Sequence, residues 1–431
     1  MKFAPAFSIC WRLAVLALPW QTRWFSDATL AGWPWEQGRL SFYVSWVFIL
    51  ATILIRPPIK MNRSAHIDGW RRLPLFFLLT ATFLATAFDP SAMRAVGQWW
   101  LQVFLLVFFC VTIIRSGVSA RQIATWTAIS LIPHVALGYW QYAIQNVIGH
   151  PWLGIATQLP ELPGVSVVEH GAYRVLRMYG GFPHPNIFGG WLAVGLLLSI
   201  WLAATASTKW RALAWSCCSA AMSVALLLTY ARGAWIAVVV GFIALVIGHI
   251  RTNVRTSSGV SFSLAAVALV CSMIAVGIVG YSQRDHLLAR FDPSARLEAK
   301  SLESRAASLE EGWKIFRRHP FFGTGPNAEL LELAASSKQH VASAPLEPPH
   351  NTFLLALVDL GLIGVLLLII FLSPHLFKHP PPTTHLLACL LILSLFDHYP
   401  WSTWSGQALV AIIFSLTLAT KKPLGLPTDP T

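Results

Sequence analysis

Six polar residues stand beside apolar segments or in the long polar stretch between them, and their types suit group transfer on a phosphorylated substrate. They are Asn186, Arg232, Arg305, His350, Asn351 and Asp397. Guanidinium groups bind phosphate oxygens through paired hydrogen bonds and keep their charge at any relevant pH, so Arg232 and Arg305 suit a diphosphate. A histidine titrates near neutrality, so His350 could accept a proton from a hydroxyl group. The sequence holds no HExxH, no DxD and no carboxylates paired at ligand spacing, so we expect no metal and no cofactor.

Arg232 is the only charged residue in the 38-residue run from Leu213 to Ile250. One helix of that length would measure about 57 Å, whereas the hydrocarbon core of a membrane is about 30 Å thick. The run therefore predicts two helices that turn near Tyr230 and Ala231, with Arg232 at the external start of the second. The alternative is an arginine that reaches into the lipid headgroups and binds no substrate.

The other candidates occupy comparable positions. A Pro-Pro pair stiffens the approach to His350 and Asn351, where the chain enters the apolar segment 351–373. Asn186 precedes another apolar segment, and Asp397 lies just before a third. A single histidine at a helix start is more often a cap or an interface residue. The gathering of several polar candidates on one face favours a site.

The long polar stretch 282–349 contains a helical pattern. Its apolar residues recur at spacings of 4, 3, 4 and 3, as Leu302, Ala306, Leu309, Trp313 and Phe316. This pattern predicts a helix from about 294 to 318 with one apolar face, and Arg305 flanks that face. The following FFGTGPN predicts a glycine turn, either a plain turn or one whose backbone approaches a ligand.

Composition assigns the chain to a membrane. Of its 431 residues, 55% are hydrophobic and 11% are charged, against about 25% charged in soluble domains. We predict an all-α polytopic protein with about twelve transmembrane helices and one long helical external loop. The apolar segments are 3–20, 40–55, 73–88, 98–114, 122–145, 187–205, 211–229, 232–250, 262–281, 351–373, 384–396 and 404–420. The six cysteines all lie in apolar segments, so no disulfide framework is expected.

The distribution of charge predicts the orientation. Alternate loops and both tails hold 15 Lys and Arg against two acids, whereas the stretch 282–349 holds nine basic and nine acidic residues. Because cytoplasmic loops are rich in Lys and Arg, we expect both termini inside and 282–349 outside. The net charge of +13 is then an orientation signal, and nucleic-acid binding is not expected. Residues after the first apolar run offer no small-residue cleavage site, so we expect an uncleaved first helix rather than a signal peptide.

These patterns divide the chain into four regions. They are an N-terminal transmembrane region with the first external loop (1–180), a transmembrane core with Asn186 and Arg232 (181–281), the external helical loop (282–349) and a C-terminal transmembrane region (350–431). An external reaction has no supply of nucleotides, so an activated donor would be lipid-borne. The residues alone thus predict a membrane-embedded group transferase that acts on a lipid diphosphate.

Five stretches of the chain also resemble a known family, the O-antigen ligases and polymerases. They are TYARGAWIA, ESRAASLEEGWKIFRRHPFFGTGPN, PHNTFLLALVDLGLIG, FPHPNIFGG and LFDHYPWSTWSGQ, which together cover roughly residues 180–407. The resemblance implies a fold related to lipid-dependent glycosyltransferases in the bacterial inner membrane. It implies a glycan donor carried on undecaprenyl diphosphate, an inverting transfer to a glycan or lipid acceptor on the outer face, and no metal.

The resemblance also implies roles. Arg232 and Arg305 would hold and neutralise the diphosphate, and His350 would orient or deprotonate the acceptor hydroxyl. Asn186 would be a supporting polar contact, and with Asn351 and Asp397 it completes the predicted substrate-binding set. Ligase and polymerase are not separated by the sequence, nor is the acceptor, which could be lipid A core, a growing glycan, another lipid or a protein. A twelve-helix secondary transporter and an assembly subunit without chemistry are the alternatives of other classes; the near-absence of acids in the spans opposes the transporter.

Overall fold

The computed structural model describes residues 4–57, 82, 89–171, 173–253, 260–336, 345–376 and 383–419, and these are mainly helical. Eleven of the twelve predicted apolar segments coincide with a helix, and the segment 73–88 lies outside the described residues except for Thr82. Four helices are long and apolar enough to cross a membrane. They are α4 (Pro90–Arg115), α6 (Pro185–Ala204), α7 (Lys209–Leu228) and the part Thr352–Ser373 of α13 (Thr352–Leu376).

Shorter apolar helices pack beside these four. They are α1 (Ala4–Ala17), α2 (Val44–Leu54), the part Arg232–Gly248 of α8 (Arg232–Asn253), the part Val267–Ser282 of α9 (Val260–Ser282), α14 (Thr384–Phe396) and α16 (Trp404–Ala419). A further helix, α5 (Ala120–Ile144), is long enough to span but carries more polar residues. The chain therefore has the helices of a polytopic membrane protein, and the total of twelve crossings stays a prediction.

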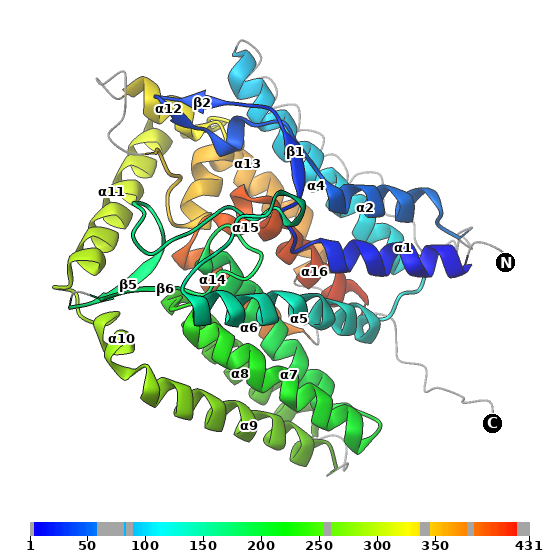
Figure 1. The fold of residues 1–431 in the computed structure, drawn as a ribbon. Helices are drawn as coiled ribbons and strands as arrows, with labels where there is room; N and C mark the ends of the chain where they lie inside the picture. Colours follow the sequence, from blue (N-terminus) through cyan, green and yellow to red (C-terminus); the bar gives the residue numbers. More distant parts are fainter. Residues whose placement is uncertain are drawn as a thin grey trace.

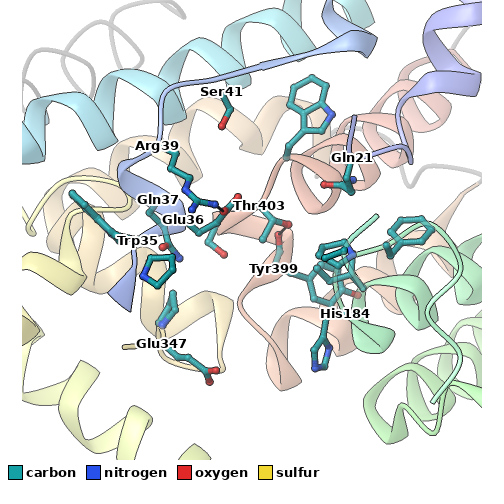
Figure 2. Close-up of a pocket in the computed structure, with 18 of the residues that line it drawn as sticks. Gln21, Trp35, Glu36, Gln37, Arg39, Ser41, His184, Glu347, Tyr399 and Thr403 are labelled. Atoms are coloured by element: carbon teal, nitrogen blue, oxygen red, sulfur yellow. Dashed lines mark hydrogen bonds and ion pairs between the residues drawn. The ribbon is translucent and has the colours of Figure 1, made fainter. Parts of the chain in front are cut away.

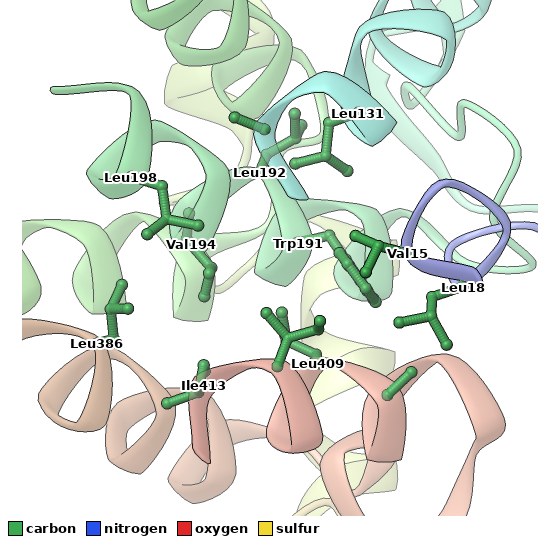
Figure 3. Packing of buried hydrophobic residues seen from close by; sticks show 14 of the residues in the cluster. Val15, Leu18, Leu131, Trp191, Leu192, Val194, Leu198, Leu386, Leu409 and Ile413 are labelled. Atoms are coloured by element: carbon green, nitrogen blue, oxygen red, sulfur yellow. The ribbon is translucent and has the colours of Figure 1, made fainter. Parts of the chain in front are cut away.

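Helix α6 forms the centre of the bundle. Nearly all of its residues are buried, and Trp191 and Leu192 lie among side chains of α5 and α16, including Leu131 and Leu409 (Figure 3). Small residues let neighbours approach closely, which is how helices pack in a membrane. At Gly190, an added Cβ would lie 1.8 Å from the Tyr399 hydroxyl, so only glycine fits there.

The predicted helical hairpin is confirmed. Helix α7 ends at Leu228, α8 begins at Arg232, and Tyr230 in the turn takes a left-handed conformation with φ 51°. The structure thus places Arg232 at the first residue of α8, as the hairpin requires. A cation is unfavourable at a helix N-terminus, so this position needs a compensating negative charge.

The helix predicted within 282–349 is confirmed as α11 (Arg296–Arg318), and its external location stays a prediction. It follows α10 (Arg284–Ala289), precedes α12 (Glu329–Ser336), and packs through Ile315 and Phe316 against Val358 of α13. In Figure 1, α10 and α11 lie at the left of the molecule, and the chain start at α1 lies at the right, at the opposite end of the bundle.

The glycine turn after α11 fills a break in α13. Gly361 has φ 63°, and the backbone on each side of it pairs with the turn. Gly325 N donates to Asp359 O over 2.9 Å, and Leu362 N donates to Pro320 O over 2.8 Å. An added Cβ at Gly323 would lie 2.4 Å from the Asp359 backbone. The close approach that the glycines permit is therefore to another helix of the same chain.

Three short hairpins add strands to the predicted all-α fold. Strand β1 (Arg23–Phe25) pairs with β4 (Ser41–Tyr43), β2 (Thr29–Leu30) with β3 (Trp33–Pro34), and β5 (Val167–His170) with β6 (Tyr173–Leu176), all antiparallel. The first of these changes the predicted segment 40–55, because its first residues form β4 and only 44–54 are helical. All three hairpins lie in loops that were predicted to be external.

Candidate active site

Four helix ends meet at the predicted site. The starts of α6, α8 and α13 surround Asp397, which follows the last residue of α14. Asn186 Nδ2 donates to Asp397 Oδ2 over 3.0 Å, and Thr352 Oγ1 donates to the Asp397 carbonyl over 2.8 Å. The structure therefore brings Asn186 and Asp397, which are 211 positions apart in the sequence, into direct contact.

Arg232 and Arg305 line one small pocket together with a third arginine, Arg290. Arg232 donates to the Arg290 carbonyl over 2.7 Å and pairs with Glu298 over 2.8 Å. Arg290 also pairs with Glu298, whose side chain is 4% exposed. Glu298 is thus the negative charge that compensates Arg232 at the start of α8.

The guanidinium of Arg305 differs from its neighbours. Arg305 belongs to α11 and lines the pocket together with Arg232. Among the described residues its guanidinium has no hydrogen-bond or ion-pair partner. A half-buried cation without a carboxylate partner is an open position for an anion, because burial strengthens its interaction with any charge that enters.

A fourth arginine supports the pocket from behind. Arg177 is buried, donates to Thr229 O over 2.6 Å and donates to Asn186 Oδ1 over 2.6 Å. Burial and the nearby charge of Arg290 lower the pKa of Arg177 to about 9, so it stays charged at neutral pH. A set of four guanidinium groups and two carboxylates results, with a net charge of +2. Its members are Arg177, Arg232, Arg290, Arg305, Glu298 and Asp397.

His350 lies beside the arginine pocket, between α11 and the end of α14. Its Nε2 is 3.7 Å from a Glu347 carboxylate oxygen, and its Nδ1 is 3.5 Å from Ser308 Oγ. The ring of His398 is 5.3 Å away in an edge-on arrangement. The His350 side chain is 16% exposed, so it is held in place while one edge faces open space.

His350, Asp397 and His398 are of types that bind metals, and their ligand atoms lie within 4.8 Å of one another. Ligand atoms around one zinc ion stand about 3.3 Å apart, given bonds of about 2.0 Å. The set is therefore wider than a formed metal site. His398 Nδ1 is 2.6 Å from Ser402 Oγ, and Asp397 Oδ2 is occupied by Asn186. The same three residues could also pass a proton from one to the next. The expectation that the reaction needs no metal stays a prediction.

The titratable groups beside His350 have defined charges. Burial lowers the pKa of His398 to about 4, and burial with the charge of Arg177 lowers the pKa of His184 to about 3, so both are neutral at pH 7. Burial alone would raise the pKa of Asp397, but the neighbouring histidines and the Asn186 hydrogen bond outweigh it, and the net pKa is lowered. Asp397 is therefore an anion between the arginines and His350.

A cavity of about 730 Å³ opens beside His350. His350 and His398 line the cavity, whereas Arg232 and Arg305 line only the small pocket. Three residues, Asn186, Asp397 and Tyr399, line both spaces. Figure 2 shows Trp35, Glu36, Gln37 and Arg39 on one side of the cavity and Tyr399, Thr403 and His184 on the other.

Residues 217–369 match the family model of the O-antigen ligases. The chain carries an O-antigen ligase domain. The matched stretch contains Arg232, Arg305, His350 and Asn351, so the family domain supplies the arginine pocket and the histidine. Comparison with curated proteins finds none that matches.

The match covers about a third of the chain and supports an O-antigen ligase-like membrane protein of the glycosyltransferase type. Asn186 and Asp397 lie outside the matched stretch, yet they contact the family domain at the pocket. Asn351 lies directly before the first residue of α13, where the sequence predicts it, and its contact with substrate stays a prediction. Its side chain accepts from Leu354 N over 2.9 Å and donates to Leu395 O over 3.1 Å, so it caps α13 and ties it to α14.

Sequence reasoning missed four members of the ligase site. Arg177, Arg290 and Glu298 stand near other charged residues, where no pattern distinguishes them, whereas His184 lies in the uncharged stretch FPHPNIFGG. One signal was present for Glu298, because an arginine at the start of an apolar helix needs a buried acid nearby. Only the folded chain shows which acid that is.

Proposed function

We propose that this protein transfers a glycan from an undecaprenyl-diphosphate carrier to an acceptor hydroxyl on the external face, by an inverting reaction without metal. The observation that carries the proposal is Arg305, a partly buried cation without a partner among the described residues, beside a histidine that faces an open cavity. One side of the site suits a leaving anion, and the other suits an entering hydroxyl.

The diphosphate would lie against the mouth of the arginine pocket, whose volume of about 20 Å³ admits one oxygen-sized group. A lipid diphosphate diester carries two negative charges at neutral pH, which match the net charge of +2 of the surrounding groups. Arg305 and Arg232 would take its oxygens, and Arg290 and Arg177 add charge from behind. During transfer the bond between the anomeric carbon and the diphosphate oxygen breaks, and the electron pair leaves with the diphosphate. Preorganised guanidinium groups stabilise that developing charge without rearrangement.

The acceptor hydroxyl would enter beside His350. As its oxygen forms the new bond to the anomeric carbon, its proton passes to the imidazole, and from there to solvent in the cavity. Glu347 at 3.7 Å and the ionised Asp397 favour the imidazolium that forms. Because the acceptor enters opposite to the departing diphosphate, the anomeric configuration is inverted.

The test is the His350→Ala variant, assayed in detergent with purified undecaprenyl-diphosphate glycan as donor. General-base help contributes about 10²–10⁴ in rate, so transfer should fall by about that factor while donor binding changes little. EDTA should leave the wild-type rate unchanged. The matched control is His319→Ala, a histidine of the same loop that is 41% exposed and pairs with Glu332. Loss of donor binding as severe as the loss of turnover would overturn the assigned role.

A further inference from the structure

The large cavity has no role in holding the diphosphate, and its walls come mostly from outside the matched family domain. We propose that it is the binding site for the acceptor saccharide, and that the N-terminal external hairpin with its turn (residues 21–43) recognises the sugar rings. This inference rests on the proposed function and adds a substrate class and a recognition element to it.

The position of the base separates the acceptor side from the donor side. His350 lines the cavity and not the arginine pocket, whereas Arg232 and Arg305 line the pocket and not the cavity. An in-line displacement needs the attacking oxygen and the leaving oxygen on opposite sides of the anomeric carbon. With the leaving group among the arginines, the space beyond His350 is where the attacking hydroxyl and the rest of its molecule belong.

The walls of the cavity suit a saccharide. They combine aromatic side chains with five glutamine side chains, which are Gln21, Gln37, Gln98, Gln102 and Gln158. Amides donate and accept hydrogen bonds, as sugar hydroxyls do, and indoles offer an apolar face with one polar atom. Trp35 and Trp404 line the cavity, and their buried Nε1 atoms have no hydrogen-bond partner among the described residues. Trp35 is 6% exposed and Trp404 is 1% exposed, so both donors are withheld from bulk water.

The size and charge of the cavity agree with this assignment. Its volume of about 730 Å³ lies in the range of about 300–1,000 Å³ that holds ligands of a few rings. Arg23 and Arg39 both pair with Glu36, so the charges of the hairpin are largely satisfied within it. A wall of satisfied charges, amides and indoles favours a hydroxyl-rich ligand over a strongly charged or purely apolar one.

The hairpin holds Trp35 in a fixed position. Its ring packs over the turn Glu36–Gly38, where a Cβ on Gly38 would lie 2.0 Å from a ring carbon. The Trp35 backbone N–H donates to Ala28 O over 2.8 Å, and the side chain also packs near Leu330. The indole is thus oriented before any ligand binds, which lowers the entropic cost of recognition.

The experiment compares Trp35→Phe and Gln37→Ala with the control Trp24→Ala. Phenylalanine keeps a ring over Gly38 and removes only the N–H, and Trp24 lies on the same hairpin but is 61% exposed and outside the cavity. Two soluble probes are titrated against the protein in nanodiscs. They are the core oligosaccharide from rough lipopolysaccharide and the repeat-unit oligosaccharide released from the host's own lipid-linked donor.

We expect at least one probe to bind the wild type, with a Kd weakened about 3–10-fold by Trp35→Phe and by Gln37→Ala, as the loss of one hydrogen bond predicts. The KM of the corresponding acceptor in the transfer assay should rise by the same factor. The Kd of the lipid-linked donor should stay within twofold of wild type, and Trp24→Ala should change none of these values.

Two results would overturn the inference while transfer itself persists. One is failure of both probes to bind the wild type at millimolar concentration. The other is a weakened donor Kd in the hairpin variants with an unchanged acceptor KM, which would assign the cavity to the donor glycan. A different result would reject the proposed function alone: hairpin-dependent probe binding with no transfer from undecaprenyl-diphosphate glycan to any acceptor.

Discussion

Glu298 offers a quantitative test of the arginine pocket. It bridges Arg232 and Arg290, and its own side chain is 4% exposed. The Glu298→Gln change keeps the shape, removes the charge and leaves the two guanidinium groups without their counter-ion. Removal of one partner from a buried pair costs about 3–5 kcal/mol. Because Arg232 is 26% exposed and water screens its share, we expect about 2–3 kcal/mol for the variant.

The negative charge of the diphosphate should partly replace the charge of the Glu298 carboxylate that the variant lacks. With Glu298 neutral, the net charge of the pocket rises from +2 to +3, so binding of an anionic diphosphate should recover part of the lost stability. The assay is the thermal unfolding midpoint in detergent, with and without undecaprenyl diphosphate. At about 2 °C per kcal/mol, the unliganded variant should unfold about 5 °C below wild type, and the carrier should raise its midpoint more than that of wild type.

The control for this test is Glu303→Gln, which removes an exposed carboxylate from the same helix. It should shift the midpoint by less than 1 °C, since surface substitutions rarely exceed about 0.5 kcal/mol. The reasoning fails if Glu298→Gln is as stable as Glu303→Gln, or if the carrier stabilises both variants equally.

Three further predictions test other parts of the site. Arg232→Lys and Arg305→Lys should each lose most of the transfer activity, because lysine keeps the charge without the bidentate fork; full transfer with lysine at both positions would favour a lipid-headgroup role. In a cysteine-free background, an impermeant reagent applied to intact cells should label a cysteine at Ser336 and not one at Ser257, and the opposite pattern would reverse the predicted orientation. The pKa of His184 is about 3 in the folded protein and 6.5 in the unfolded chain, so its neutral ring contributes stability that is complete above pH 6.5 and is lost as the pH falls toward 3. Thermal unfolding midpoints should therefore fall over that pH range, and they should fall less in the His184→Asn variant.

The parts of the fold that depend on membrane thickness could be predicted from the sequence. Arg232 follows a turn because 38 apolar residues cannot cross a bilayer as one helix, and α11 follows from an apolar stripe of helical period. Both arguments use local patterns and one length, so they need no knowledge of partners. They also placed Arg232 and Arg305 at the same end of the bundle, where the structure joins them in one pocket.

Other parts depend on contacts between segments far apart in the sequence. Nothing local indicates that Asn186 contacts Asp397, or that Glu298 rather than another acid of the loop lies beside Arg232. The hairpin formed by β1 and β4 is the clearest omission, because its strands have three residues each and no alternating pattern marks them. Its place beside the cavity follows from how the loop packs in the folded chain. The residues proposed to bind the acceptor could therefore not be predicted from the sequence.

The break in α13 fixes the distance along the helix between Gly361 and His350. Between Gly361 and His350 the helix has nine residues, Thr352–Leu360, which rise about 14 Å at 1.5 Å per residue. On both sides of the break, backbone hydrogen bonds join the helix to the turn that follows α11, so Thr352–Leu360 sets the distance between that turn and His350. One inserted residue would shift His350 by about 1.5 Å and turn it by about 100°, away from its contacts with Ser308 and His398. A change in the number of residues in Thr352–Leu360 should therefore disturb the site more than the same change beyond Gly361.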